Sequence, residues 1–123
     1  IRCEFVNTRL TGSHFVECFI SHVLIDKSHC SLVDFADCKM EFCEFHDSIF
    51  NEANFFENQT KNLQFRGLKL EKASFYETPL NGVDMSTSDV YSLKTDLKSI
   101  KGAIISSFQA REICHLLGIK VID

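Results

Sequence analysis

Six cysteines and five histidines are the residues of this chain whose chemistry could be redox-active, metal-binding or catalytic. Thiolates and imidazoles bind zinc, and paired cysteines form disulfides, but both uses depend on characteristic spacings. The chain contains no Cys-x-x-Cys pair, and its histidines are scattered without a nucleophile at a matching spacing. It also lacks a glycine-rich phosphate loop. The sequence therefore predicts a protein that is not an enzyme, with no metal site and no cofactor.

The cysteines instead follow a period of five residues that runs through almost the whole chain. A large apolar residue recurs at most fifth positions from Phe5 to Ile105, and a small residue usually lies two positions before it. Cys30 takes a large position, and four cysteines take the small one: Cys3, Cys18, Cys38 and Cys43. Because free cysteine packs as a small hydrophobe, we expect reduced, structural cysteines and a cytoplasmic location.

A period of five matches neither a strand nor a helix, and a short fixed period indicates a repeat array. The clearest units are Ala53-Asn54-Phe55, Ala73-Ser74-Phe75 and Cys43-Glu44-Phe45. They resemble the pentapeptide-repeat family, whose unit is roughly Ala-Asp/Asn-Leu-X-X. The resemblance implies an all-β solenoid, a right-handed quadrilateral β-helix with four pentapeptides per coil. We assign residues 1–105 to it, and we expect further coils upstream because Ile1 enters in mid-repeat.

Stacking the sequence every 20 residues arranges the large apolar residues in four columns. One column forms a ladder of aromatic residues: Phe15, Phe35, Phe55 and Phe75. Strands in neighbouring coils lie about 4.8 Å apart, a spacing that allows their rings to stack with an offset. We therefore expect this column to be core rather than a ligand site.

Three features interrupt the pattern. Asn58 and Thr60 place polar side chains at both inward positions of one unit, which predicts a distorted corner or a hydrogen-bonded patch. Pro79 cannot donate a backbone hydrogen bond to a neighbouring coil. Thr95 and Lys98 are poor core residues, so we expect the coil to loosen over residues 93–98.

Residues 106–123 leave the period of five and follow a helical pattern. Ser106 with Gln109 suits a capping box, and Gly118 suits the position after a helix C-terminus. We expect a short α-helix that caps the solenoid, followed by a short strand at 119–122. The helix presents many apolar residues, so it either caps alone or caps and also forms a homodimer: Phe108, Ala110, Ile113, Cys114, Leu116 and Leu117.

Residues 101–110 and 116–119 look like the C-terminal end of the quinolone-resistance branch of pentapeptide-repeat proteins. That resemblance implies a bacterial homodimer that mimics duplex DNA, binds DNA gyrase or topoisomerase IV, and acts in fluoroquinolone resistance. The chain departs from the branch in two respects. Ser107 stands where a proline is common, and no insertion is present that could form a projecting loop.

One side of the predicted coil carries a row of carboxylates beside outward apolar residues. The expected partner-binding acidic face consists of five residues: Glu17, Asp34, Asp37, Glu57 and Glu77. Phe56 and Tyr76 form the expected exposed apolar edge. This face is either a surface offered to a basic groove or a solvated face that provides solubility.

The charge distribution restricts the partners. The formal net charge is −4, and residues 34–57 hold seven carboxylates against the single cation Lys39, so direct nucleic-acid binding is not expected. No run of about 18 apolar residues predicts a membrane span. Two functions remain: a DNA mimic that binds a type II topoisomerase, or a general interaction scaffold with an unrelated partner.

Overall fold

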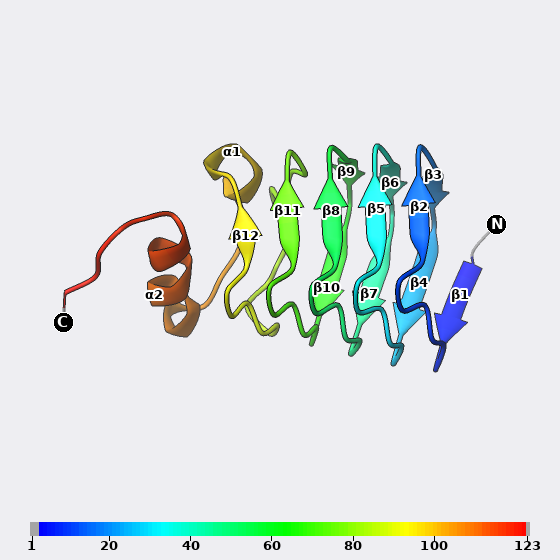
Figure 1. The fold of residues 1–123 in the computed structure, drawn as a ribbon, viewed down its shortest axis with the longest axis horizontal. Coiled ribbons are helices and arrows are strands. Elements are labelled where there is room, and N and C mark those ends of the chain that lie inside the picture. The colour runs from blue at the N-terminus through cyan, green and yellow to red at the C-terminus, as the bar shows by residue number, and fades with distance from the viewer. Residues whose placement is uncertain (1–2, 123) are drawn as a thin grey trace.

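The computed structural model describes residues 3–122, which form a parallel β-solenoid of about five turns followed by a short C-terminal helix (Figure 1). Each coil has four sides of five residues, which we call faces 1 to 4 in the order in which the chain passes through them. The sequence prediction of a quadrilateral solenoid is confirmed.

Three faces are parallel sheets, and the fourth is held by isolated bridges. Face 1 contains β1 (Cys3–Val6), β4 (Val23–Asp26), β7 (Glu44–His46) and β10 (Gln64–Arg66). Face 2 is held by bridges that link Arg9, His29, Ile49, Lys69 and Asp89. Face 3 contains β2 (His14–Val16), β5 (Asp34–Ala36), β8 (Asn54–Phe56), β11 (Ser74–Tyr76) and β12 (Lys94–Thr95). Face 4 contains β3 (Phe19–Ser21), β6 (Lys39–Glu41) and β9 (Gln59–Lys61).

Most corners of the coil are made by a residue in the left-handed backbone region. At the corners between faces 3 and 4, φ is +55° at Glu17, +54° at Asp37, +55° at Glu57 and +51° at Glu77. This conformation costs a residue that is not glycine about 1 kcal/mol. A hydrogen bond to the next coil offsets the cost, as when the Asp37 N–H donates to the Phe56 carbonyl at 3.1 Å.

The hydrophobic core contains a column of stacked rings inside face 3. The ring centroids of Phe15 and Phe35 lie 4.9 Å apart, those of Phe35 and Phe55 lie 5.2 Å apart, and those of Phe55 and Phe75 lie 4.5 Å apart. Phe15, in the first coil, is partly buried, and the other three rings are buried. The register of 20 residues places each ring above the next.

The cysteines are reduced, and most of them pack inward. Cys30, Cys38 and Cys43 are buried, and burial raises the pKa of the Cys30 thiol to about 11. The Cys38 thiol donates to the Phe15 carbonyl at 3.0 Å. Cys3 differs from this expectation, because in the first coil its side chain is exposed.

The polar stretch at residues 58–62 is a hydrogen-bonded patch and not a distorted corner, because β9 continues through it. Asn58 is only 3% exposed. Its Oδ1 accepts from the Cys38 N–H at 2.9 Å, and its Nδ2 donates to the Phe35 carbonyl at 2.9 Å. The amide side chain therefore replaces a small apolar residue without leaving its polar atoms unpaired.

The sequence predicts that the fifth coil loosens over residues 93–98, and this prediction is wrong. The coil forms a single helical turn instead. This turn, α1 (Leu97–Ile100), begins after Asp96, whose side chain accepts from the Ser99 N–H at 2.7 Å. The turn points Lys98 outward and brings Ser99 to the inward position, where its Oγ accepts from the Thr78 N–H at 3.1 Å. The coil thus obtains a small inward residue one position later than the period predicts.

The C-terminal helix α2 (Ser107–Leu116) has the predicted caps. Ser106 and Gln109 form a reciprocal capping box, with hydrogen bonds of 3.2 and 3.0 Å. Gly118 has a φ of +80°, and the Ile119 N–H donates to the Cys114 carbonyl at 2.9 Å, which completes a Schellman turn. Neither helix in the described part of the chain is long and apolar enough to cross a membrane.

The prediction of a strand at residues 119–122 is wrong. These residues have no strand pairing, and Ile119, Val121 and Ile122 are exposed. The Schellman turn directs the chain away from α2, so the segment meets no sheet edge.

We expect Phe55→Ala to lower the free energy of unfolding by about 3–5 kcal/mol, because Phe55 is fully buried between two stacked rings. The neighbouring Phe56→Ala is the matched control, since it removes the same ring from the surface and should cost less than about 1 kcal/mol. Urea unfolding followed by circular dichroism measures both. Equal losses would contradict the inward placement of this column.

Candidate protein-binding surface

The sequence-predicted acidic residues are largely brought together at one corner of the solenoid. Four of them, Glu17, Asp37, Glu57 and Glu77, lie at the corners between faces 3 and 4 in successive coils, and we call them the acidic stripe. All four are exposed. Backbone hydrogen bonds connect each corner to the following coil, so the stripe is held at the spacing of the coils.

The neighbouring carboxylates of the acidic stripe raise the pKa of Glu57. A hydrogen bond shared with Asp37 raises the pKa of Glu57, and partial desolvation and the charges of Asp37 and Glu77 raise it further. No salt bridge between residues 3–122 reaches a carboxylate of the stripe. The stripe is therefore a line of mutually repelling charges that a cationic partner would stabilise.

Asp34 does not lie in the acidic stripe, although the sequence grouped it there. It is the first residue of β5, on the opposite edge of face 3. Its carboxylate accepts from Asn54 Nδ2 at 2.9 Å and lies 3.3 Å from His14 Nδ1. The register of 20 residues aligns His14, Asp34 and Asn54 in one column, so stacking the sequence could have indicated this pairing.

A row of apolar side chains runs beside the acidic stripe on face 3. Val16, Ala36, Phe56 and Tyr76 are aligned by the strand register. Phe56 and Tyr76, the two predicted edge residues, are 40% and 39% exposed. The surface thus combines negative charge with aromatic rings, as a protein-binding patch often does.

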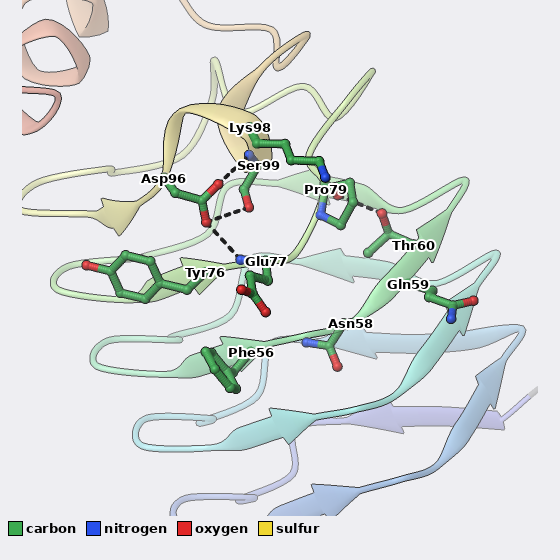
Figure 2. A pocket seen from close by; sticks show the side chains of 10 residues that line it. All are labelled: Phe56, Asn58, Gln59, Thr60, Tyr76, Glu77, Pro79, Asp96, Lys98 and Ser99. Carbon is green, nitrogen blue, oxygen red and sulfur yellow. Dashed lines mark hydrogen bonds between the residues drawn. The ribbon is translucent and has the colours of Figure 1, made fainter.

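A groove of about 820 Å³ opens where this surface meets the third to fifth coils (Figure 2). It lies between the aromatic pair Phe56 and Tyr76 and the segments that contain Pro79 and α1. Face 4 has no strand in the fourth and fifth coils, so its wall recedes there. Sequence reasoning identified both interruptions but did not predict that together they make a groove.

Asp96 fixes the end of this groove. Its Oδ2 accepts from the Glu77 N–H at 2.8 Å and from Ser99 Oγ at 2.9 Å. Desolvation opposes ionisation of Asp96, but the hydrogen bonds from Glu77 and Ser99 outweigh it and hold the pKa below its ordinary value. The carboxylate thus replaces the backbone carbonyl that accepts from the equivalent corner in earlier coils.

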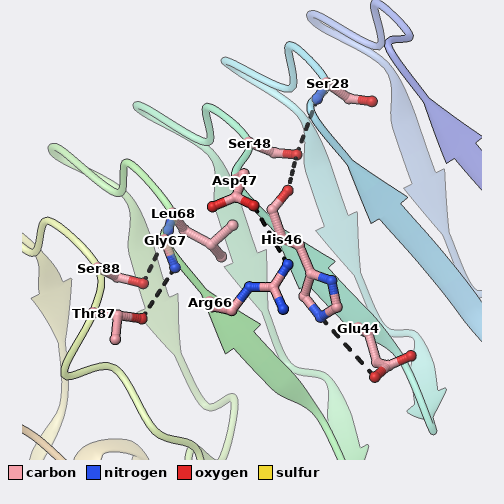
Figure 3. Close-up of polar contacts among 10 residues, drawn as sticks. All are labelled: Ser28, Glu44, His46, Asp47, Ser48, Arg66, Gly67, Leu68, Thr87 and Ser88. Carbon is pink, nitrogen blue, oxygen red and sulfur yellow. Dashed lines mark hydrogen bonds and ion pairs between the residues drawn. The ribbon is translucent and has the colours of Figure 1, made fainter.

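The corner between faces 1 and 2 carries a different kind of polar surface (Figure 3). Arg66 lies 3.4 Å from Asp47, and hydroxyl groups accept backbone N–H groups, as Thr87 does from Gly67 at 3.1 Å. Charges here are mixed and paired. The acidic stripe is therefore a property of one corner and not a general consequence of the coil.

The C-terminal residues predicted for capping or dimerisation divide into two groups. Ile113 is buried, and Leu116 and Leu117 pack against the core, whereas Ala110 and Cys114 are half-buried. Phe108 is 94% exposed and covers nothing.

Gln109 has a capping role that the sequence did not indicate. Its Nε2 donates to the Met85 carbonyl at 2.8 Å and to the Ser88 carbonyl at 2.7 Å. It thereby satisfies backbone acceptors of the last full coil, in addition to completing the capping box of α2.

Metal binding finds no support in the described residues, 3–122, because no group of three or more His, Cys, Asp or Glu side chains could hold an ion.

The geometry defines the architecture without reference to other proteins. The faces of the first four coils are five residues long, and the register advances by 20 residues per coil. The chain folds as a β-helix built from repeats of five residues. No family model matches the sequence, and no curated protein matches it.

Solved structures similar to this β-helix include a pentapeptide repeat protein, Rfr23, from the cyanobacterium Cyanothece 51142. It is 13% identical over 85% of this chain and 86% of its own, with a TM-score of 0.42. A trypsin-treated variant of QnrB1, a plasmid-mediated fluoroquinolone resistance protein, is 12% identical over 98% of each chain, with a TM-score of 0.49. Full-length QnrB1 is 12% identical over 81% of this chain and 71% of its own, with a TM-score of 0.36. At these values the comparisons carry no argument about function.

We expect Glu57→Gln to stabilise the pentapeptide-repeat β-helix at pH 7 and low salt, because it removes the central charge of the acidic stripe. The folded-state pKa of Glu57 is raised, so its charge opposes folding above that pKa, and the penalty disappears below the ordinary value. The gain in melting temperature should shrink with added salt and with falling pH. Glu52→Gln, at an exposed corner between faces 2 and 3, is the control; equal gains from both variants would contradict the repulsion.

We expect Asp96→Ala to cost about 1–2 kcal/mol, the usual effect of losing a helix N-cap. The pKa of Asp96 is lowered in the folded state, so its contribution is complete above the ordinary value and is lost as the pH falls through the lowered one. The difference from wild type should therefore be full at pH 6 and diminish below about pH 4. Urea unfolding across this range is the measurement, and a loss that does not depend on pH would refute the ionised cap.

Proposed function

We propose that this chain is a non-enzymatic binding protein that offers the acidic stripe and its apolar row to a basic surface of a protein partner. The observation that carries the proposal is the crowding of carboxylates at one corner, where no salt bridge among residues 3–122 supplies a compensating cation. This repulsion does not stabilise the fold. Binding to a cationic surface would explain why the carboxylates lie together.

The partner that we propose is a bacterial type II topoisomerase, DNA gyrase or topoisomerase IV, and the chain acts as a mimic of duplex DNA. The C-terminal resemblance to the quinolone-resistance branch supports this choice, as does a stripe that suits a groove built for phosphates. Coils repeat at about 4.8 Å, which differs from the phosphate spacing, so the match lies in the total field and not in single charges. Such a protein would act in the bacterial cytoplasm and contribute to fluoroquinolone resistance.

We further propose a homodimer formed through the C-terminal end. Phe108 at 94% exposure supports it, together with the exposed side chains of Tyr91 and Ile104. Large apolar side chains gathered at one end of a solenoid are typical of a contact surface. A dimer with this arrangement would carry two acidic stripes.

The test is DNA supercoiling by purified bacterial gyrase, with and without ciprofloxacin, during titration of the protein. We expect wild type to change supercoiling in a concentration-dependent manner and Glu57→Lys/Glu77→Lys to weaken the effect at least tenfold, because two charges of the stripe are reversed. The control Glu52→Lys/Glu71→Lys makes the same charge change near face 2 and should behave as wild type.

The control separates the two functions left open by the sequence. If both variants lose the effect on supercoiling equally, the effect depends only on net charge. If both variants keep it, the stripe is not part of the binding surface. A wild-type protein that acts on neither gyrase nor topoisomerase IV would refute the topoisomerase partner and favour the general scaffold.

A further inference from the structure

We propose that the groove beside the acidic stripe seats an arginine side chain of the protein partner. This inference rests on the proposed function, in which the partner is basic, and it names the group that is recognised. The groove is bounded by aromatic rings, a carboxylate and α1 (Figure 2).

The aromatic wall suits a flat cation. Phe56 and Tyr76 are paired in the register of β8 and β11, so their rings lie one coil apart on the same side of the groove. Both side chains are partly exposed. A guanidinium group stacks on such rings and is more weakly hydrated than an ammonium group, which favours arginine over lysine.

The charges of the groove are complementary to a cation at one wall only. Glu77 lines that wall, and after a hydrogen bond with Asp37, desolvation and the charge of Asp37, its negative charge also raises the pKa of the neighbouring Glu57. An incoming guanidinium would relieve this repulsion and could donate two parallel hydrogen bonds to a carboxylate.

The lining contains two more charged groups, Asp96 and Lys98. Both oxygens of Asp96 accept hydrogen bonds, Oδ1 from the Ser99 N–H and Oδ2 from the Glu77 N–H and Ser99 Oγ. With Glu77, the groove therefore holds two carboxylates and one ammonium group, so its net charge is negative and favours a cation.

The groove also has the space for this ligand. Its volume of about 820 Å³ exceeds that of one arginine side chain, and Pro79 and α1 hold the opposite wall back from the aromatic pair. The Thr60 hydroxyl donates to the Pro79 carbonyl at 2.6 Å, which fixes this segment. The site is thus formed before the partner arrives.

The test uses blocked Gly-Arg-Gly and Gly-Lys-Gly peptides, which carry the same charge, titrated into ¹⁵N-labelled protein. We expect the arginine peptide to shift the amide signals of Glu77 and Ser99 saturably and to bind about fivefold more tightly than the lysine peptide. Tyr76→Ala and Glu77→Gln should each weaken the arginine peptide by about fivefold or more. Tyr76→Phe keeps the ring and should bind as wild type.

Phe19→Ala is the control, because Phe19 is an exposed aromatic residue that lies outside the groove and outside the proposed dimer contact. Four outcomes would each overturn the inference. These are equal binding of the two peptides, shifts confined to other surfaces, absence of saturable shifts, and no effect of Tyr76→Ala. The amide spectrum of each variant reports whether the coils remain folded, and Tyr76→Phe keeps the test decisive if the alanine variant unfolds.

The peptide assay contains no topoisomerase, so the two proposals fail separately. Specific arginine binding without any effect on gyrase would leave the groove standing and remove the partner. An effect on gyrase that depends on the acidic stripe, without specific arginine binding, would support the topoisomerase partner and refute the groove as an arginine site.

Discussion

The structure depends on one constraint, the hydrogen bonding of each coil to the residues 20 positions further along the chain. The left-handed corners turn the backbone and direct their N–H groups to carbonyls of the next coil, as Glu57 does to Tyr76 at 3.1 Å. Every side chain is therefore stacked on its equivalents in the neighbouring coils. The same register that aligns Phe35, Phe55 and Phe75 inside the solenoid aligns the carboxylates outside it.

Functional surface arises where this regularity ends. In the fourth and fifth coils, Pro79 and the helical turn α1 remove the strands of face 4, and the Asp96 side chain takes over a backbone hydrogen bond. A fully regular prism would present flat faces with few concavities. The groove is a consequence of two local departures from the repeat, held in place by polar contacts.

Repetition explains how much could be predicted from the sequence. The frame of five residues predicted the coil, the Phe ladder and four of the five residues assigned to the acidic face, because each needs only the register. It failed where a contact depends on the particular side chains present. Ser99 replaces Lys98 at the inward position, and residues 119–122 find no sheet edge, and neither follows from a period. The register does align Asp34 with His14 and Asn54, but their contacts depend on the particular side chains at these positions.

The amide side chain of Gln109 has a consequence for assembly. A solenoid ends in a row of backbone groups that would accept another chain, and uncontrolled addition there leads to fibres. Gln109 occupies the carbonyls of Met85 and Ser88, and Ile113 and Leu117 cover the apolar interior beneath α2. These carbonyls are therefore not free to accept an added strand, so a contact with a second copy at this part of the last coil must use side chains.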